Sequence, residues 1–121
     1  MADILLTEDD LSLSKVYQKW LEAEGHVVAL AEDGLMGFKT ALHGGLPDLL
    51  ITDIMMPGED GEELTAAFKK IAGGLPVLIV TAVSDESKLN RLRQYPNVRG
   101  VLKKPVTREE LLGAVDRALE K

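Results

Sequence analysis

Short apolar blocks alternate with longer amphipathic blocks along the chain. The apolar runs are rich in valine, isoleucine and leucine and cover residues 3–7, 26–30, 48–52, 76–80 and 100–103. Each run is too short for a typical helix and nearly continuous in its hydrophobicity, a pattern typical of strands that are covered on both faces of a parallel sheet. The runs therefore predict five buried strands.

The segments between these runs have helical spacing. The first helix is predicted from Leu13, Val16, Tyr17, Trp20 and Leu21, which recur at i, i+3, i+4, i+7 and i+8 before Gly25. Three further helices are predicted from Leu35, Phe38 and Leu42, from Leu64, Ala67, Phe68 and Ile71, and from Leu89 and Leu92 after a cap at Ser84 or Asp85. The motif "TREE" at 107–110 predicts a capping box that begins the last helix, which continues through Leu111, Val115 and Ala118.

A strand followed by a helix, repeated five times, predicts an α/β fold. We expect a doubly wound five-stranded parallel sheet of (βα)5 type, with right-handed crossovers and the flavodoxin-like strand order 2-1-3-4-5. The length of 121 residues suits one domain, so residues 1–121 are expected to fold together.

Composition narrows the functional classes. The chain has no cysteine, which excludes disulfides and thiolate zinc sites, and a net charge of −6, which argues against non-specific nucleic-acid binding. No apolar run approaches the length of a membrane span, and the N-terminus lacks the pattern of a signal peptide. We expect a cytoplasmic protein that binds neither membrane nor nucleic acid directly.

Polar residues follow the predicted strands where those strands end. They are Glu8, Asp9 and Asp10 after the first strand, Asp53 after the third, Thr81 after the fourth, and Lys103 and Lys104 after the fifth. Because the carboxyl ends of parallel strands share one edge, these side chains are expected to converge there.

Clustered carboxylates require a cation, and oxygen ligands without histidine or cysteine favour Mg²⁺. With a hydroxyl and an ammonium nearby, the set suits phosphoryl transfer, in which an aspartate can act as the nucleophile. Asp53 is the best candidate because it stands alone on the middle strand. Only one of the two adjacent lysines can point to the site. We expect this to be Lys104, which precedes Pro105 and is therefore biased to an extended conformation, with Lys103 in solvent.

Four ordered motifs carry a resemblance that spans essentially the whole chain. "ILLTEDD", "PDLLITDIMMPGEDGEEL", "VLIVTA" and "LKKP" resemble the receiver domain of two-component response regulators, including single-domain regulators of the chemotaxis type. The resemblance implies that Glu8, Asp9, Asp53 and the backbone carbonyl of Met55 bind Mg²⁺. It also implies that Asp53 is the phosphoacceptor and that Thr81 follows the phosphoryl group. Lys104 would pair with that group, with a cis peptide into Pro105.

The resemblance also implies binding partners. The donor would be a phosphohistidine on a sensor histidine kinase or a histidine phosphotransfer protein, and small acyl phosphates can substitute. Such a domain phosphorylates and dephosphorylates itself only and is not otherwise an enzyme. The output protein would bind the face formed by residues Ser84 to Lys121. Val101 stands where the family often has an aromatic residue, so a coupled threonine and aromatic switch is not expected here.

Simpler and competing interpretations remain open at this point. Asp53 can cap a turn, Thr81 can bond locally, and Asp10 is expected to cap the first helix. The domain can also be a pseudo-receiver that binds partners without phosphate. A small Mg²⁺-dependent aspartyl phosphatase is a third class, but no segment is long enough for a lid. Labelling by acetyl phosphate discriminates the first class from the second.

Overall fold

The fold comes from a computed structural model that describes residues 1–54 and 61–120. Met55, the expected source of a backbone ligand, lies outside the described residues. The strands are β1 Asp3–Thr7, β2 Val27–Ala31, β3 Leu49–Thr52, β4 Val77–Thr81 and β5 Val98–Lys103. The helices are α1 Leu11–Ala23, α2 Gly34–Gly44, α3 Gly61–Ile71, α4 Glu86–Arg93 and α5 Arg108–Leu119.

The five strands form one parallel sheet in the order β2-β1-β3-β4-β5. This confirms the predicted doubly wound α/β fold and its strand order. At the carboxyl end of the sheet, Thr7 of β1 lies opposite Ala31 on one side and Thr52 of β3 on the other. The residues that follow Thr7 and Thr52 therefore leave the sheet side by side.

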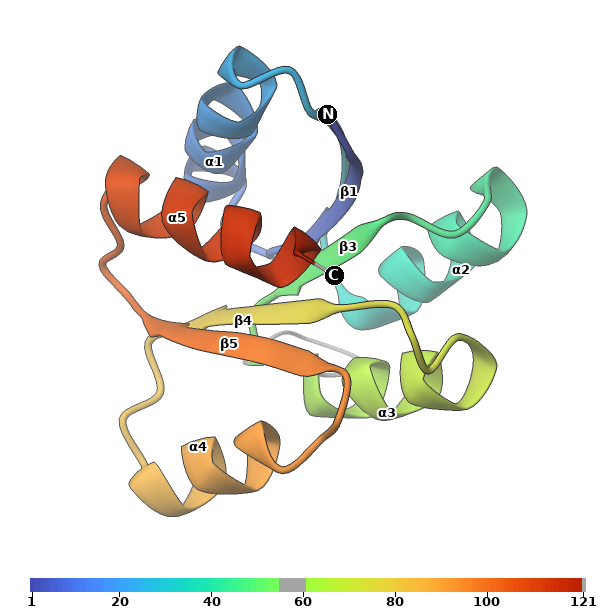
Figure 1. The fold of residues 1–121 in the computed structure, drawn as a ribbon, viewed down its shortest axis with the longest axis vertical. Coiled ribbons are helices and arrows are strands. Elements are labelled where there is room, and N and C mark those ends of the chain that lie inside the picture. The colour runs from blue at the N-terminus through green and yellow to red at the C-terminus, as the bar shows by residue number, and fades with distance from the viewer. Residues whose placement is uncertain (55–60, 121) are drawn as a thin grey trace.

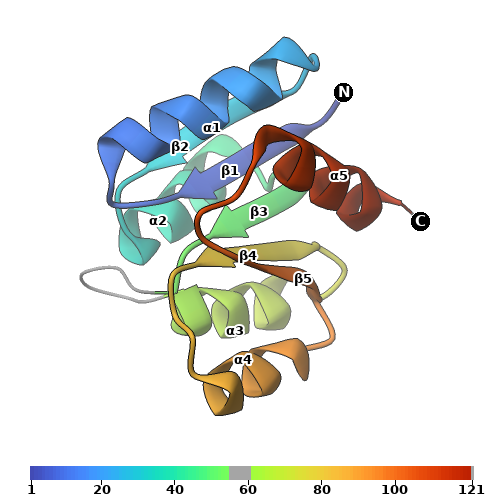
Figure 2. The same ribbon diagram turned by 90° about the vertical axis from the view of Figure 1, so that its left-hand side faces the viewer.

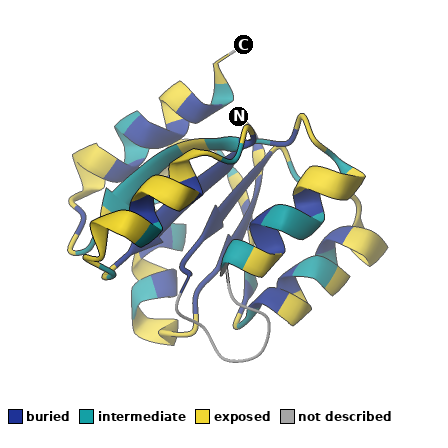
Figure 3. Ribbon diagram, turned by 90° about the horizontal axis from the view of Figure 1, so that it is seen from below, coloured by how far each residue is buried: buried dark blue, intermediate teal, exposed yellow. Residues whose placement is uncertain are grey.

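Helices cover both faces of the sheet (Figure 1), with α1 and α5 on one face and α2, α3 and α4 on the other. The inner strands β1, β3 and β4 are buried between helices whose outer sides are exposed, whereas the edge strands β2 and β5 are partly exposed (Figure 3). One apolar cluster joins the sheet to α1 and α5 through residues such as Tyr17, Leu21 and Leu111. A second cluster joins it to the other three helices through Leu64, Phe68 and Leu89. The sheet thus lies between two separate apolar cores, one on each face.

Short polar side chains begin the helices, as the sequence predicts. The carboxylate of Asp10 accepts a hydrogen bond of 3.1 Å from the amide of Leu13, and Asp85, rather than Ser84, caps α4. Thr107 and Glu110 form the predicted capping box of α5. These caps satisfy amides that would otherwise lack a partner at each helix start.

The prediction was wrong about which residues α2 buries. Leu35 and Leu42 are 48% and 55% exposed, whereas Gly34, Gly37 and Ala41 are buried. The cause is a close approach to the sheet, because a Cβ atom at Gly37 would lie 2.5 Å from Cγ2 of Thr7. A helix that packs this tightly buries its small residues and leaves the leucines at the flanks.

The burial of three further side chains and the start of β5 also differ from the prediction. Val16 and Ile71, predicted to face inward, are 40% and 47% exposed. Trp20, predicted to lie in the core, is only partly buried and packs against the cluster under α1 and α5. β5 begins two residues earlier than the apolar run at 100–103, because Val98 already pairs with Val77 before a register shift.

Candidate functional site

The carboxyl ends of the strands meet at one edge of the sheet, opposite the edge near which the N-terminus and the end of α5 lie (Figure 2). Glu8 follows β1 and Asp53 follows β3, directly after the paired Thr7 and Thr52. The amide of Asp53 donates to the carbonyl of Thr7 at 3.2 Å, and the amide of Glu8 donates to the carbonyl of Ala31 at 3.0 Å. Backbone pairing therefore brings the two carboxylates together.

Lys104 joins these two carboxylates. Its Nζ lies 2.5 Å from Oε1 of Glu8 and 2.7 Å from Oδ2 of Asp53. Glu8 and Asp53 are only 3% and 6% exposed, so both charges are held away from bulk water. The peptide bond from Lys104 to Pro105 is cis, and the amide of Lys104 donates to the carbonyl of Thr81 at 2.8 Å. Lys104 is thus held at the end of β5 with its ammonium over the acidic pair.

Three carboxylates can share a cation at this edge. Glu8, Asp9 and Asp53 each offer an oxygen, and these oxygens all lie within 4.8 Å of one another. Two oxygens bound to one Mg²⁺ at about 2.1 Å are at most about 4.2 Å apart, so small side-chain rotations bring the set into range. Asp9 is exposed while the other two are buried, which gives an ion a path from solvent. The donor set therefore fits a hard cation.

Burial and charge oppose each other at Glu8. Burial raises the pKa of Glu8 above its usual value, because desolvation outweighs the hydrogen bonds from Lys104 and from the amide of Asp10. Burial acts to lower the pKa of Lys104, but the hydrogen bonds to Asp53 and Glu8 outweigh it and raise that pKa. The ammonium is therefore firmly charged and neutralises part of the acidic cluster.

The remaining predicted site residue is Thr81, at the end of β4 next to β3. Its side chain is fully buried, and its hydroxyl accepts a hydrogen bond of 3.2 Å from the amide of Val83. This is the local bond that the simpler interpretation of Thr81 expects, and its role toward a phosphoryl group stays a prediction. Val101 is partly buried and packs against the core under α2, α3 and α4.

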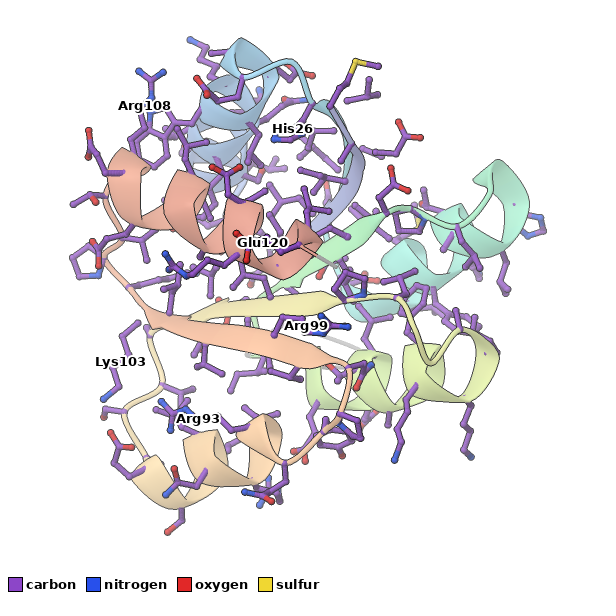
Figure 4. The ribbon with its side chains drawn as sticks, viewed as in Figure 1. His26, Arg93, Arg99, Lys103, Arg108 and Glu120 are labelled. Carbon is purple, nitrogen blue, oxygen red and sulfur yellow. The ribbon has the colours of Figure 1, made fainter. Side chains whose placement is uncertain are left out.

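Lys103 lies on the other side of β5, exposed, with its Nζ 2.8 Å from Oε1 of Glu86. Arg93 also approaches Glu86, at 3.8 Å, and Figure 4 shows Arg93 and Lys103 beside α4 and β5. Arg91 forms a two-pronged ion pair with Glu62 of α3, with bonds of 2.8 Å and 2.9 Å. These three basic residues of α4 and β5 are therefore paired with acids.

Sequence reasoning missed the two threonines beneath the acidic residues. The hydroxyl of Thr7 donates to that of Thr52 at 2.5 Å, and the hydroxyl of Thr52 donates to the carbonyl of Asp53 at 2.7 Å. The available signal was positional, since "LLTE" and "LITD" both place a threonine between an apolar strand and an acid.

The sequence model of one protein family, the response regulator receiver domain, matches residues 4–116 of this chain. The chain belongs to this family. The receiver is a signalling module of two-component systems rather than a conventional enzyme, as the resemblance implied. Within the described residues, no helix has both the length and the apolar character needed to span a membrane.

Curated relatives of this receiver are longer regulators. It is 37% identical over 119 residues to the transcriptional regulatory protein GlrR of Escherichia coli K12, covering 98% of this chain and 26% of that protein. It is 34% identical over 119 residues to the probable transcriptional regulator ycf29 of Pyropia yezoensis, covering 96% of this chain and 52% of that one. The chain thus spans between about a quarter and a half of the length of these relatives.

Solved receiver structures have the same fold. A receiver domain from Clostridium thermocellum superposes with a TM-score of 0.87 at 26% identity, covering 98% of this chain and 94% of that one. The chemotaxis protein CheY4 of Vibrio cholerae gives a TM-score of 0.88 at 27% identity, with 98% and 99% covered.

Proposed function

We propose that this receiver accepts a phosphoryl group on Asp53 from a phosphohistidine donor in a Mg²⁺-dependent reaction. The observation that carries the proposal is the position of Asp53: a nearly buried carboxylate at a strand end, between an ammonium and two further acids. In this setting one oxygen of Asp53 can attack phosphorus while the surrounding charges neutralise the phosphoryl oxygens.

The transfer needs only the donor and one proton from water. A carboxylate oxygen of Asp53 forms a bond to phosphorus, and the bond from phosphorus to the donor's histidine nitrogen breaks. That nitrogen keeps the electron pair, and because the other ring nitrogen takes up a proton from water, the donor leaves as a neutral imidazole. The product is a mixed anhydride on Asp53, which water later hydrolyses.

Glu8, Asp9 and Asp53 would hold Mg²⁺, and the expected carbonyl of Met55 would complete the protein ligands. The ion, when bound, supplies positive charge to the phosphoryl oxygens. Lys104 now neutralises Glu8 and Asp53 together. With Glu8 serving as a ligand, the ammonium of Lys104, which lies 2.7 Å from Oδ2 of Asp53, would pair with Asp53 and its phosphoryl group. Thr81 would donate its hydroxyl to that group.

The donor would be a sensor histidine kinase or a histidine phosphotransfer protein. The output protein would bind the face from Ser84 to Lys121, where Lys103 and Arg93 form solvent-exposed ion pairs with Glu86. GlrR and ycf29 are transcriptional regulators by name. Control of transcription through further parts of a longer protein therefore belongs to the same proposal. A cytoplasmic location stays a prediction.

Mass measurement tests the proposal. The full chain is incubated with acetyl phosphate and Mg²⁺ and weighed intact, and we expect a gain of one phosphoryl group that Asp53→Asn and EDTA both abolish. Asp48→Asn is the matched control, because Asp48 lies at the opposite end of β3 and its oxygen still accepts from the amide of Asp3. It should label like the unchanged protein.

Two results would contradict the proposal. Absence of labelling from acetyl phosphate and from phosphorylated kinases would favour a pseudo-receiver. Steady release of phosphate from an external ester would favour the phosphatase. The metal assignment fails separately if Mg²⁺ moves no amide resonance of residues 8–10 and 53–54.

A further inference from the structure

Two buried hydroxyls lie directly beneath the acidic site. Thr7 and Thr52 are both fully buried, and they face each other across β1 and β3 as the last pair of residues in these strands. The residues two positions earlier on the same face, Leu5 and Leu50, are apolar core residues. Valine would fill the same space with the same shape and no polar atom, so packing alone does not require threonine at either position.

The hydroxyls form a directed chain that ends on the backbone of Asp53. Thr7 donates to Thr52, and Thr52 donates to the carbonyl of Asp53. The amide of Asp53 donates in turn to the carbonyl of Thr7. The carbonyl of Asp53 is therefore held by the hydroxyl of Thr52 and its amide by the main chain of Thr7, although Asp53 lies beyond the end of β3.

The same pair lies at the point from which Asp53 and Glu8 leave the sheet. Glu8 follows Thr7 directly, so a bond between the two threonine hydroxyls ties the strand ends at the point where both acids leave the sheet. Mg²⁺ demands near-ideal octahedral geometry, so its affinity depends on how closely the carboxylates are held in place before it binds. Outer hydrogen bonds that orient metal ligands commonly change metal affinity by about tenfold or more.

We propose that Thr7 and Thr52 are positioning residues that hold the backbone of Asp53 and its spacing from Glu8 for Mg²⁺ binding and phosphoryl transfer. The inference rests on the proposed function but assigns a role that the acidic residues, Thr81 and Lys104 do not fill. The two hydroxyls are bonded to each other and to the carbonyl of Asp53, so they act through its main chain.

The test replaces both hydroxyls by methyl groups of the same shape. The double variant Thr7→Val/Thr52→Val loses the bond between the two hydroxyls at little cost, but it also leaves the carbonyl of Asp53 without the donor Thr52. We therefore expect it to fold with a Tm lowered by roughly 5–10 °C. We expect its Kd for Mg²⁺ to rise about threefold to tenfold and its rate of labelling by acetyl phosphate to fall by a similar factor. Thr52→Ser keeps the hydroxyl and should stay within about twofold of the unchanged protein in both measurements.

Thr65→Val is the matched control, because Thr65 is also a fully buried threonine but lies in α3 rather than at a strand end. It should leave the Kd for Mg²⁺ unchanged. If the double valine variant does not fold, Thr52→Ala is compared with Thr52→Ser, since both lose the methyl group and only alanine loses the hydroxyl. Thr52→Ala is then expected to be labelled by acetyl phosphate more slowly than Thr52→Ser.

The outcomes separate this inference from the proposed function. If the unchanged protein neither binds Mg²⁺ nor gains a phosphoryl group, the proposed function fails first. If the unchanged protein does both and the folded valine variant matches it, or alanine matches serine at position 52, the positioning role is overturned. Weaker binding in Thr65→Val to the same extent would also overturn it.

Discussion

The close contact between α2 and β1 gives the sharpest prediction about stability. Gly37 lies inside α2, and a Cβ atom there would lie 2.5 Å from Cγ2 of Thr7, nearer than carbon atoms can approach without a shift. Thr7 is fully buried and β-branched, and its hydroxyl is bonded to Thr52, so it cannot rotate away freely. We therefore expect Gly37→Ala to destabilise the protein although alanine is the better helix former.

Opposing contributions determine how much Gly37→Ala lowers the free energy of unfolding. Alanine in place of glycine gains about 1 kcal/mol of helix propensity. Overpacking a tight core site costs about 1–3 kcal/mol. A disturbed hydroxyl bond between Thr7 and Thr52 adds about 1 kcal/mol to that cost. The net loss in the free energy of unfolding is about 1–3 kcal/mol, or a fall in Tm of about 4–12 °C for a chain of this size.

Urea denaturation of five proteins measures this contact: the unchanged protein, Gly37→Ala, Gly44→Ala, Thr7→Ser and the double variant Thr7→Ser/Gly37→Ala. Gly44→Ala in the same helix is the control, because a Cβ atom there meets no heavy atom within 4 Å, and it should be neutral or slightly stabilising. Thr7→Ser removes the clashing methyl group and keeps the hydroxyl. In that background Gly37→Ala should become neutral or stabilise by up to about 1 kcal/mol.

The coupling free energy between positions 7 and 37 should thus be about 1–3 kcal/mol. The reasoning is refuted if Gly37→Ala is as stable as Gly44→Ala. It is equally refuted if Thr7→Ser leaves the cost of Gly37→Ala unchanged.

Three further predictions concern charge and capping. Lys104→Met leaves Glu8 and Asp53 to repel each other, and we expect a loss of about 3–5 kcal/mol at pH 7 in denaturation experiments. Burial raises the pKa of Glu8 and the hydrogen bond from Lys104 opposes that rise, so loss of this bond raises the pKa further in the native variant than in the unchanged protein. Protonation of Glu8 then relieves the repulsion in the variant, and this deficit should shrink from pH 7 to pH 5; a deficit that grows would contradict the assignment. The hydrogen bonds from Arg91 lower the pKa of Glu62, and a carbon-detected NMR titration of Arg91→Gln should show that pKa rising toward its ordinary value, whereas an unchanged pKa would mean that the ion pair does not form in solution. Thr107→Ala should reduce the free energy of unfolding by about 1 kcal/mol, because it removes the capping box of α5, and an unaltered urea midpoint would refute this.

Local patterns predicted most of the architecture. Five apolar runs separated by amphipathic segments determine an alternating α/β order, and the described structure confirms five parallel strands in the order expected. The caps at Asp10 and Thr107 were also predictable, since a cap depends on side chains within three residues of the helix start. Periodicity failed for α2, where Leu35 and Leu42 point outward, because the buried side of that helix is chosen by how closely it can approach β1.

The sequence by itself determined the fold class and the residue types at the strand ends, because strand alternation and helix spacing are short-range properties of the chain. Only the tertiary structure decided that Lys104 bridges Glu8 and Asp53, that Arg91 is neutralised by Glu62, and that the hydroxyls of Thr7 and Thr52 bond to each other across β1 and β3. These contacts join residues between 29 and 96 positions apart along the chain. Their distances depend on strand register and helix approach, which no local pattern specifies.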